Sequence, residues 1–418
     1  MKGERFTWHN CSTNHRSLWK RLDRVLVNDS WLGRWLEVFY DNLTPRTSDH
    51  SSLVLRSDLN QSQVRMFRFD NYLALSPGFL SSIHDTWQHQ IVGTPMYSVT
   101  RKLKALKPVF RRQRKSKGDL SLNVKLANEF LEIAQTILQL DRHNCLLLHV
   151  EHCYRLVFLK ATKLEHVMLQ QRAKIQWLKG GDQCSRVFFH KVATRRASKR
   201  IYQISDEEGH TYLDPDGIND MFVDYYRRLL GGTRSNGVLD LRYLRPWAKH
   251  ILTVEEGHAM IRPVTKDEVK WTVFDIAEDK APGPDGYSSG FYKAAWSVVG
   301  DEVTRAVLDF FATGRLLKQV NALLTLIPKV RSPNLVADFR SISCCNVLYK
   351  IITKILGQRI SVVLDKMINP SQNAFVPGRL IGDNILLAQE LFSGYKQARL
   401  PPRCALKVDL KKAYDTIE

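Results

Sequence analysis

The stretch Lys407-Val408-Asp409-Leu410-Lys411-Lys412-Ala413-Tyr414-Asp415-Thr416-Ile417-Glu418 organises this sequence. The short apolar run that precedes and enters it predicts a buried strand ending at Asp409, and a helix is expected directly afterwards. A carboxylate at a buried strand end needs a reason, because an unpaired buried charge is costly. One reason is a Mg²⁺ site facing phosphates. The alternative is an ordinary strand-to-helix corner in which Asp409 caps the helix.

The charge of the chain favours a polyanionic partner, with nucleic acid ahead of an anionic membrane. The 418 residues hold 62 Lys and Arg against 42 Asp and Glu, a net charge of +20. Residues 101–200 carry 23 of the basic and 7 of the acidic side chains, which is a net +16. This excess exceeds that of an ordinary solvated helical face, so contacts with phosphates are expected. The candidates are Arg111, Arg112, Arg114, Lys115, Arg195, Arg196, Lys199 and Arg200.

The cysteines and the hydropathy exclude several classes of protein. The seven Cys are odd in number and show no C-x-x-C spacing, which argues against disulfide partners and a zinc site. No apolar run reaches the length of a transmembrane helix, and no signal peptide is recognisable. We therefore expect no membrane partner, and a location in the nucleus or the cytoplasm.

Residues 1–58 are expected to form short strands at 6–8, at 21–27 and near 47–55. Asp23 and His50 would lie at strand ends, where a carboxylate can orient an imidazole for acid–base or phosphate chemistry. The alternative is that Asp23 pairs with Arg21 or Arg24 while His50 is an exposed turn residue.

Three further regions follow from periodicity and turn signals. Residues 59–98 are expected to be a connector with scattered aromatic side chains. Residues 99–260 are expected to be basic and mainly helical, with a break between helices at 111–118 and a β-hairpin near 201–213. From 261 onward, residues 281–286 form a Pro- and Gly-rich loop, 298–313 a helix, 323–329 a strand, and about 345–364 a long helix. Loops or strand ends in this region carry Lys329, Arg340 and Arg379.

Five motifs in this last region resemble the reverse transcriptase of LINE-type (non-LTR) retrotransposons, in the order found in that family. They are Ala-Pro-Gly-Pro-Asp-Gly (281–286), Leu-Ile-Pro-Lys (326–329), Asp-Phe-Arg-x-Ile-Ser (338–343), Ala-Phe-Val-Pro-Gly-Arg (374–379) and Val-Asp-Leu-x-Lys-Ala-Tyr-Asp (408–415). The strings Phe-Thr-Trp, Arg-Leu-Asp and Ser-Asp-His near the N-terminus resemble the end of the endonuclease of the same elements. The resemblance points to a plant-like element.

The resemblance implies an α+β, multidomain fold. Residues 1–58 would be the C-terminal remnant of an apurinic-endonuclease-like β-sandwich, and 261–418 would be the fingers and first palm strand of a right-hand polymerase. The implied activity is RNA-directed DNA synthesis by two-metal nucleotidyl transfer, with Mg²⁺ as cofactor and an RNA template, a DNA primer or target and dNTPs as partners.

The resemblance also implies residue roles. Asp409 would hold both metals with help from the backbone of Leu410, and Tyr414 would exclude a 2′-hydroxyl. Lys329 and Arg340 would bind the triphosphate, while Arg379 and the 281–286 loop would lie nearer the template and primer. In the nuclease remnant, His50 would be catalytic and Asp23 its orienting partner.

Two departures from the family pattern bear on activity. Ser341 stands where the family usually has Pro, which loosens the segment behind Arg340. The second carboxylate motif and the thumb do not occur in the sequence, so we expect weak Mg²⁺ binding, no polymerisation by this chain and no nuclease activity. The alternatives to a polymerase are a non-catalytic, basic nucleic-acid-binding remnant and an unstable pseudogene product.

Overall fold

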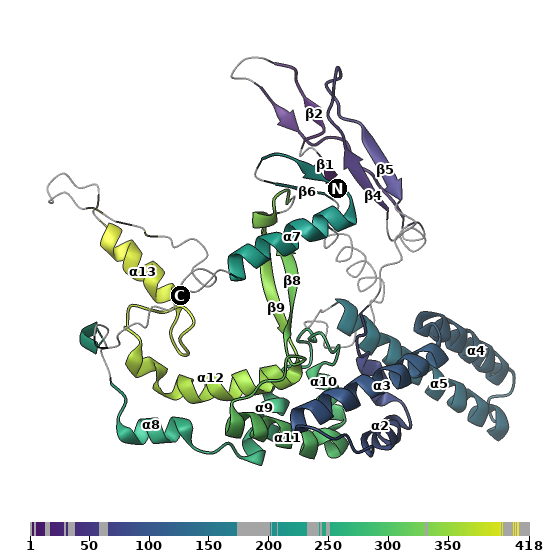
Figure 1. Cartoon of the computed structure of the whole chain (residues 1–418). Helices are drawn as coiled ribbons and strands as arrows, with labels where there is room; N and C mark the ends of the chain where they lie inside the picture. The colour runs from purple at the N-terminus through teal and green to yellow at the C-terminus, as the bar shows by residue number, and fades with distance from the viewer. Residues whose placement is uncertain are drawn as a thin grey trace.

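The computed structural model describes most of the chain. It covers residues 2–3, 6–12, 17–28, 31, 38–57, 66–173, 201, 203–206, 208–231, 242, 245–247, 251–330, 333–393, 395, 404, 406 and 408. Helices and small sheets are mixed along these residues (Figure 1), which agrees with the expected α+β, multidomain class.

The N-terminal strands form two small sheets. The strands are β1 (Lys2–Gly3), β2 (Trp8–His9), β3 (Trp19–Lys20), β4 (Val38–Asn42) and β5 (Leu53–Ser57). One sheet has the order β1-β4-β5, in which β1 runs parallel and β5 antiparallel to β4. The other sheet pairs β2 with β3.

The prediction of a strand at 21–27 is wrong, and β4 was not predicted from the sequence. Residues 21–28 have no regular secondary structure. Their path is fixed instead by the buried Thr7, whose hydroxyl accepts hydrogen bonds from the backbone of Leu22 and Asp23. A side-chain acceptor has here replaced the ladder partner that a strand would need.

The segment expected to be a connector instead supplies part of the main hydrophobic core. It contains the short helix η1 (Asn71–Leu75), α2 (Phe79–Trp87) and the start of α3 (Pro95–Lys117). Its aromatic side chains Phe69, Tyr72, Phe79 and Trp87 are buried in one cluster with residues from α9 (Lys266–Asp275), α10 (Ser289–Ala294), α11 (Trp296–Thr313) and α12 (Val347–Met367). Residues far apart in the sequence therefore form one packed body.

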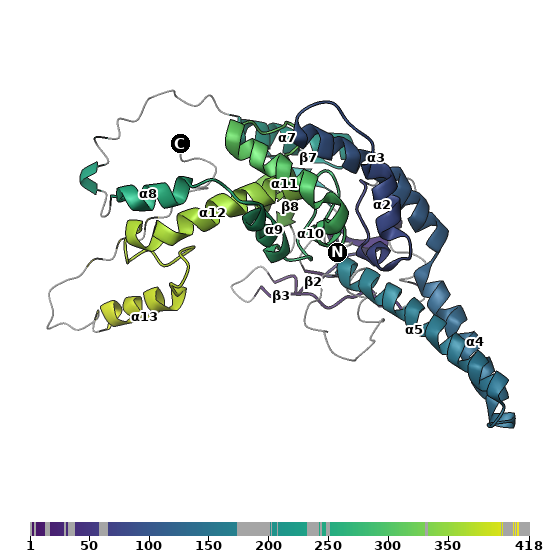
Figure 2. The same ribbon diagram turned by 90° about the horizontal axis from the view of Figure 1, so that it is seen from below.

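Helices α4 (Leu120–Leu140) and α5 (Cys145–Ala173) form an antiparallel hairpin that extends away from this body (Figure 2). The basic residues 111–117 are the last turns of α3, and the break between helices falls at Gly118 and Asp119. Gly118 has a positive φ of 65°, and the Asp119 side chain caps α4 by accepting from the Ser121 amide. The basic cluster is therefore helical, a correction to the expected break at 111–118.

A second, smaller core joins the middle of the chain to the last sheet. Strands β6 (Ile204–Ser205) and β7 (Thr211–Tyr212) form the expected hairpin, which is followed by α7 (Pro215–Leu230). Ile204, Ile218 and Phe222 pack against Val336 and Phe339. Helix α7 thus covers one face of the sheet made by β8 (Ala322–Pro328) and β9 (Phe339–Cys345).

The remaining elements complete the C-terminal half. They are η3 (Arg245–Trp247), α8 (Val254–Ile261), η4 (Val336–Asp338) and α13 (Ile381–Phe392). None of the helices in the described part of the chain is long and apolar enough to span a bilayer.

Candidate nucleotide and nucleic-acid site

Lys329 and Arg340 lie on the same open face of the β8–β9 hairpin. Ile327 pairs directly with Arg340, and Lys329 follows Ile327 by two residues. Because side chains alternate between the faces of a sheet, these three share one face. The opposite face carries Leu326 and Phe339, which pack toward α7. Both basic side chains are exposed.

The end of the hairpin is held in a fixed position. The Lys329 amide donates to the Asp338 carbonyl at 2.7 Å, and its ammonium donates to the Ala337 carbonyl at 2.7 Å. The Asp338 carboxylate in turn accepts from the amides of Asn334 and Leu335. The backbone that carries Lys329 and Arg340 is therefore ordered by hydrogen bonds rather than left as a free loop tip.

The loop 281–286 lies against the other end of the hairpin, where β9 passes into α12. A Cβ at Gly283 would lie 2.2 Å from the side-chain oxygen of Asn346 and 2.3 Å from the backbone nitrogen of the same residue, so only glycine fits. Lys350 on α12 donates to the Ala281 carbonyl at 2.5 Å. Burial raises the pKa of Asp285 to about 6. These contacts with Asn346 and Lys350 hold the loop against the junction between β9 and α12.

Sequence reasoning did not single out the groups around Asp285. Lys107 on α3 and Lys350 on α12 both act electrostatically on this carboxylate and oppose the rise of its pKa. Desolvation lowers the pKa of Lys107, and its ammonium also lies 5.5 Å from the centre of the Phe67 ring. An acidic residue inside a Pro- and Gly-rich loop was the only sequence feature that pointed to this group. Its partners Lys107 and Lys350 could not be found in the same way, because they lie on helices distant in sequence.

The basic residues at the end of α3 divide into two kinds. Arg114 is an ion-pair partner of Asp70 at 3.4 Å, and the guanidinium of Arg111 lies 5.8 Å from the centre of the Phe67 ring. Arg112 and Lys115 are exposed, and the described residues provide no ion-pair partner for either. Arg112 and Lys115 are therefore the members of this group most available to phosphates.

Arg379 has a structural role that the sequence did not indicate. Its guanidinium donates to the backbone carbonyls of Asp365, Ile368, Asn369 and Gln372 and to the Asp365 carboxylate at 2.7 Å. Its side chain is only 13% exposed. The carbonyls of Asp365 and Ile368 belong to the end of α12, where carbonyls lack partners within the helix, and those of Asn369 and Gln372 belong to the turn that follows.

Asp23 and His50 are brought together by the N-terminal strands. The His50 Nδ1 atom lies 2.8 Å from an Asp23 carboxylate oxygen. This hydrogen bond raises the pKa of His50 and lowers the pKa of Asp23. Both side chains are partly exposed. The alternative pairings of Asp23 with Arg21 or Arg24 are not the ones observed.

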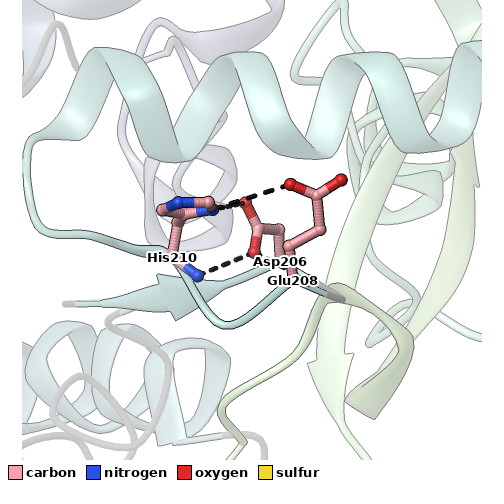
Figure 3. A group of neighbouring side chains, drawn as sticks. All are labelled: Asp206, Glu208 and His210. Carbon is pink, nitrogen blue, oxygen red and sulfur yellow. Dashed lines mark hydrogen bonds and ion pairs between the residues drawn. The ribbon is translucent and has the colours of Figure 1, made fainter.

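A group of metal-ligating side chains occurs in the β6–β7 turn (Figure 3). The ligand atoms of Asp206, Glu208 and His210 lie within 4.8 Å of one another. However, one Asp206 oxygen accepts from the Glu208 and His210 amides, and the other lies 3.4 Å from the His210 ring. These contacts are those of a closed turn, so hydrogen bonding within the hairpin accounts for the group.

Several of the expected site residues lie outside the described residues. They are Asp409, Leu410 and Tyr414 of the opening motif and Arg195, Arg196, Lys199 and Arg200 of the second basic cluster. Their roles therefore stay predictions.

Residues 327–418 match the family model described as "Reverse transcriptase (RNA-dependent DNA polymerase)". This segment begins inside β8 and includes Lys329, Arg340, Arg379 and the Asp409 motif. The C-terminal part of the chain is therefore similar to reverse transcriptases, a family that generally requires Mg²⁺ and binds nucleic-acid templates and dNTPs.

The chain as a whole is similar to the "Transposon TX1 uncharacterized 149 kDa protein" of Xenopus laevis. The two are 25% identical over 425 residues, which cover 99% of this chain and 32% of that protein. The chain therefore spans about a third of the length of this relative. Together the two comparisons confirm the resemblance to a non-LTR retrotransposon reverse transcriptase, while the plant-like origin stays a prediction.

Proposed function

We propose that the chain provides nucleotide-binding and nucleic-acid-binding parts of the RNA-directed DNA polymerase of a non-LTR retrotransposon. The observation that carries this proposal is the open face of the β8–β9 hairpin, on which Lys329 and Arg340 are both exposed. The match of residues 327–418 to reverse transcriptases supports it.

The two side chains suit a triphosphate for different reasons. The planar guanidinium of Arg340 can donate two parallel hydrogen bonds to phosphate oxygens. Lys329 adds a compact positive charge, and its ammonium donates one hydrogen bond to the Ala337 carbonyl at 2.7 Å. Asp409 is the residue that would hold Mg²⁺, which when bound neutralises phosphate charge and favours ionisation of the primer hydroxyl. Leu410 and Tyr414 would contact the same nucleotide.

Template and primer would contact the basic helical region without reading sequence. The exposed Arg112 and Lys115 on α3, together with the basic residues at 195–200, present charge and no recognisable base-reading motif. Contacts of this kind release counterions, so the affinity should fall steeply with salt.

The decisive experiment measures dNTP binding to the whole chain with Mg²⁺ and an annealed RNA template and DNA primer. The double variant Lys329→Gln/Arg340→Gln should weaken dNTP binding at least roughly tenfold, because charge-assisted phosphate contacts are lost. Its affinity for the template–primer should stay within about twofold. Lys270→Gln/Arg315→Gln removes two exposed basic residues elsewhere and is the matched control. Equal losses in the two double variants, or no detectable dNTP binding by the wild-type chain, would overturn the proposal.

The N-terminal pair supports a second proposal, the remnant of a nuclease site. We propose that Asp23 and His50 belong to an endonuclease-like phosphodiesterase site, on the strength of their 2.8 Å contact. Among the described residues, the 206–210 turn is the only group of three or more metal-ligating side chains, so none adjoins this pair. The chain is therefore expected not to nick supercoiled plasmid with Mg²⁺. Nicking that is lost in His50→Ala would show that this chain contains a complete nuclease site.

A further inference from the structure

The projecting α4–α5 hairpin carries an exposed apolar surface, which we call the outer hairpin face. Large apolar side chains of both helices lie on it, and each is between 36% and 86% exposed. On α4 they are Leu122, Leu126, Phe130, Ile133, Ile137 and Leu140, and on α5 they are Leu146, Val150, Tyr154 and Val157.

The spacing of these residues is that of a packed helix–helix interface. Successive positions on both helices differ by three or four residues, which places them in one stripe along each helix. A separate stripe on α4, with Ala127, Leu131 and Ala134, is buried against α5. Helix α4 therefore has two apolar stripes, and pairing with α5 buries only one of them.

The two exposed stripes lie on the same side of the hairpin. The rings of Phe130 and Tyr154, one from each stripe, are stacked with centroids 5.8 Å apart and an interplanar angle of 14°. The hairpin extends away from the rest of the fold in both views (Figures 1 and 2), so a partner can reach this face. The stripes together form a surface two helices wide.

The dimensions of the face fit association with a second copy. Helix α4 has 21 residues, and at 1.5 Å per residue it is about 30 Å long. Two helices packed side by side are roughly 20 Å wide, so the face covers on the order of 600 Å² per copy. Two such faces would bury about 1,200 Å² in total, the lower end of the range for specific, stable interfaces. Eight of the ten large apolar side chains on the face are aliphatic and none is basic, which favours a protein partner over nucleic acid.

The charges along the edges favour one arrangement of the two copies. The α4 edge carries Lys125, Glu129 and Glu132, a net charge of −1, and the α5 edge carries Lys160 and Lys163, a net charge of +2. A two-fold axis parallel to the helices places α4 of one copy against α5 of the other. Edges of opposite net charge then meet, and all neighbouring helices are antiparallel.

We propose that two copies of this chain associate through the outer hairpin face, so that their hairpins form an antiparallel four-helix bundle. The arrangement buries both exposed stripes. It is independent of the proposed polymerase function, because none of the residues on the face is a nucleotide-site or phosphate-contact candidate.

Sedimentation of the full chain over a range of concentrations tests the association. The wild-type chain should form dimers, and Ile133→Glu should raise the dissociation constant at least roughly tenfold by placing a charge in the centre of the face. Leu159→Glu is the matched control, because Leu159 is equally exposed on α5 but lies outside the stripe. A wild-type chain that stays monomeric up to about 100 µM, a concentration at which a stable interface is occupied, would overturn the proposal. So would equal effects of the two substitutions.

Crosslinking tests the orientation. The Phe130–Tyr154 contact fixes the height of α4 relative to α5 within one copy. In the proposed arrangement, position 132 of one copy would then lie level with Cys153 of the second copy. Glu132→Cys should therefore give a disulfide-linked dimer under mild oxidation, and the link should be absent when Cys153→Ser is added. Crosslinking that persists in the double variant would overturn the proposed arrangement.

Discussion

Replacing Arg379 separates its two competing roles, a contact to nucleic acid and a clamp on the end of α12. In the structure its guanidinium bonds to four backbone carbonyls and to the Asp365 carboxylate. Arg379→Gln keeps a polar side chain but cannot span these acceptors. We expect residues 360–378 to lose local stability while the affinity for nucleic acid stays unchanged.

The magnitude follows from the contacts that are lost. A hydrogen bond from a charged donor contributes about 1.5–3 kcal/mol, but bonds that share one side chain are not additive. Asp365 is 76% exposed, so the ion pair itself adds little. A cation near a helix C-terminus adds about 0.3–1 kcal/mol. The expected loss is therefore about 2–4 kcal/mol.

Amide hydrogen exchange measures this local stability directly. The expected loss corresponds to exchange that is faster by about 30-fold to several hundred-fold over the last turn of α12, at 1.4 kcal/mol per tenfold change. Arg112→Gln should have the opposite effect. Removing this exposed arginine should reduce the salt dependence of nucleic-acid binding by about one counterion and leave amide exchange unchanged. If Arg379→Gln weakened nucleic-acid binding and left exchange unchanged, the structural assignment of Arg379 would be refuted.

Four further predictions concern ion pairs and titrating groups. Arg359→Met removes a side chain that is 9% exposed and bonded to a carboxylate and three carbonyls, so unfolding in urea should show a loss of about 3–5 kcal/mol. Lys366→Gln breaks an ion pair whose lysine is 59% exposed and should cost under about 1 kcal/mol. The pKa of Asp285 is raised to about 6, so the stabilisation from its protonated form is complete below the unfolded pKa and is lost as the pH rises through 6. Asp285→Asn should therefore be more stable than wild type by about 2 kcal/mol at pH 7 and similar at pH 4, whereas equal unfolding curves at both pH values would contradict the burial of this carboxylate. In Asp23→Asn the pKa of His50, followed by NMR titration, should fall toward 6.5, and an unchanged pKa would mean that the pair does not persist in solution.

Elements with a strong local signal could be predicted from the sequence. The helix expected at 298–313 is α11, and it ends at Gly314, which has a φ of 68°. The strand expected at 323–329 is β8, and the hairpin near 201–213 is present. In each of these elements, periodicity and turn residues act within the element itself, so no distant partner is needed to recognise it.

Strand β9 could not be predicted in this way. Its sequence Phe-Arg-Ser-Ile-Ser-Cys-Cys lacks a continuous apolar alternation, and the strand exists because each residue pairs with β8 in register. The same limit applies to Arg379, whose acceptors on α12 become visible only once the chain has folded back. Non-local pairing, rather than local preference, decides these features.

One consequence of the core bears on the candidate site as a whole. Helix α3, which carries Arg112 and Lys115, contributes Val99, Leu103 and Phe110 to the same core as α12. The loop 281–286 is held to α12 at Lys350, and the β8–β9 hairpin leads directly into that helix. The proposed phosphate-contacting helix and the proposed nucleotide-contacting hairpin are therefore parts of one packed body. A substitution that loosens this core should change nucleotide and nucleic-acid binding together. A substitution on the open face of the β8–β9 hairpin should change nucleotide binding alone.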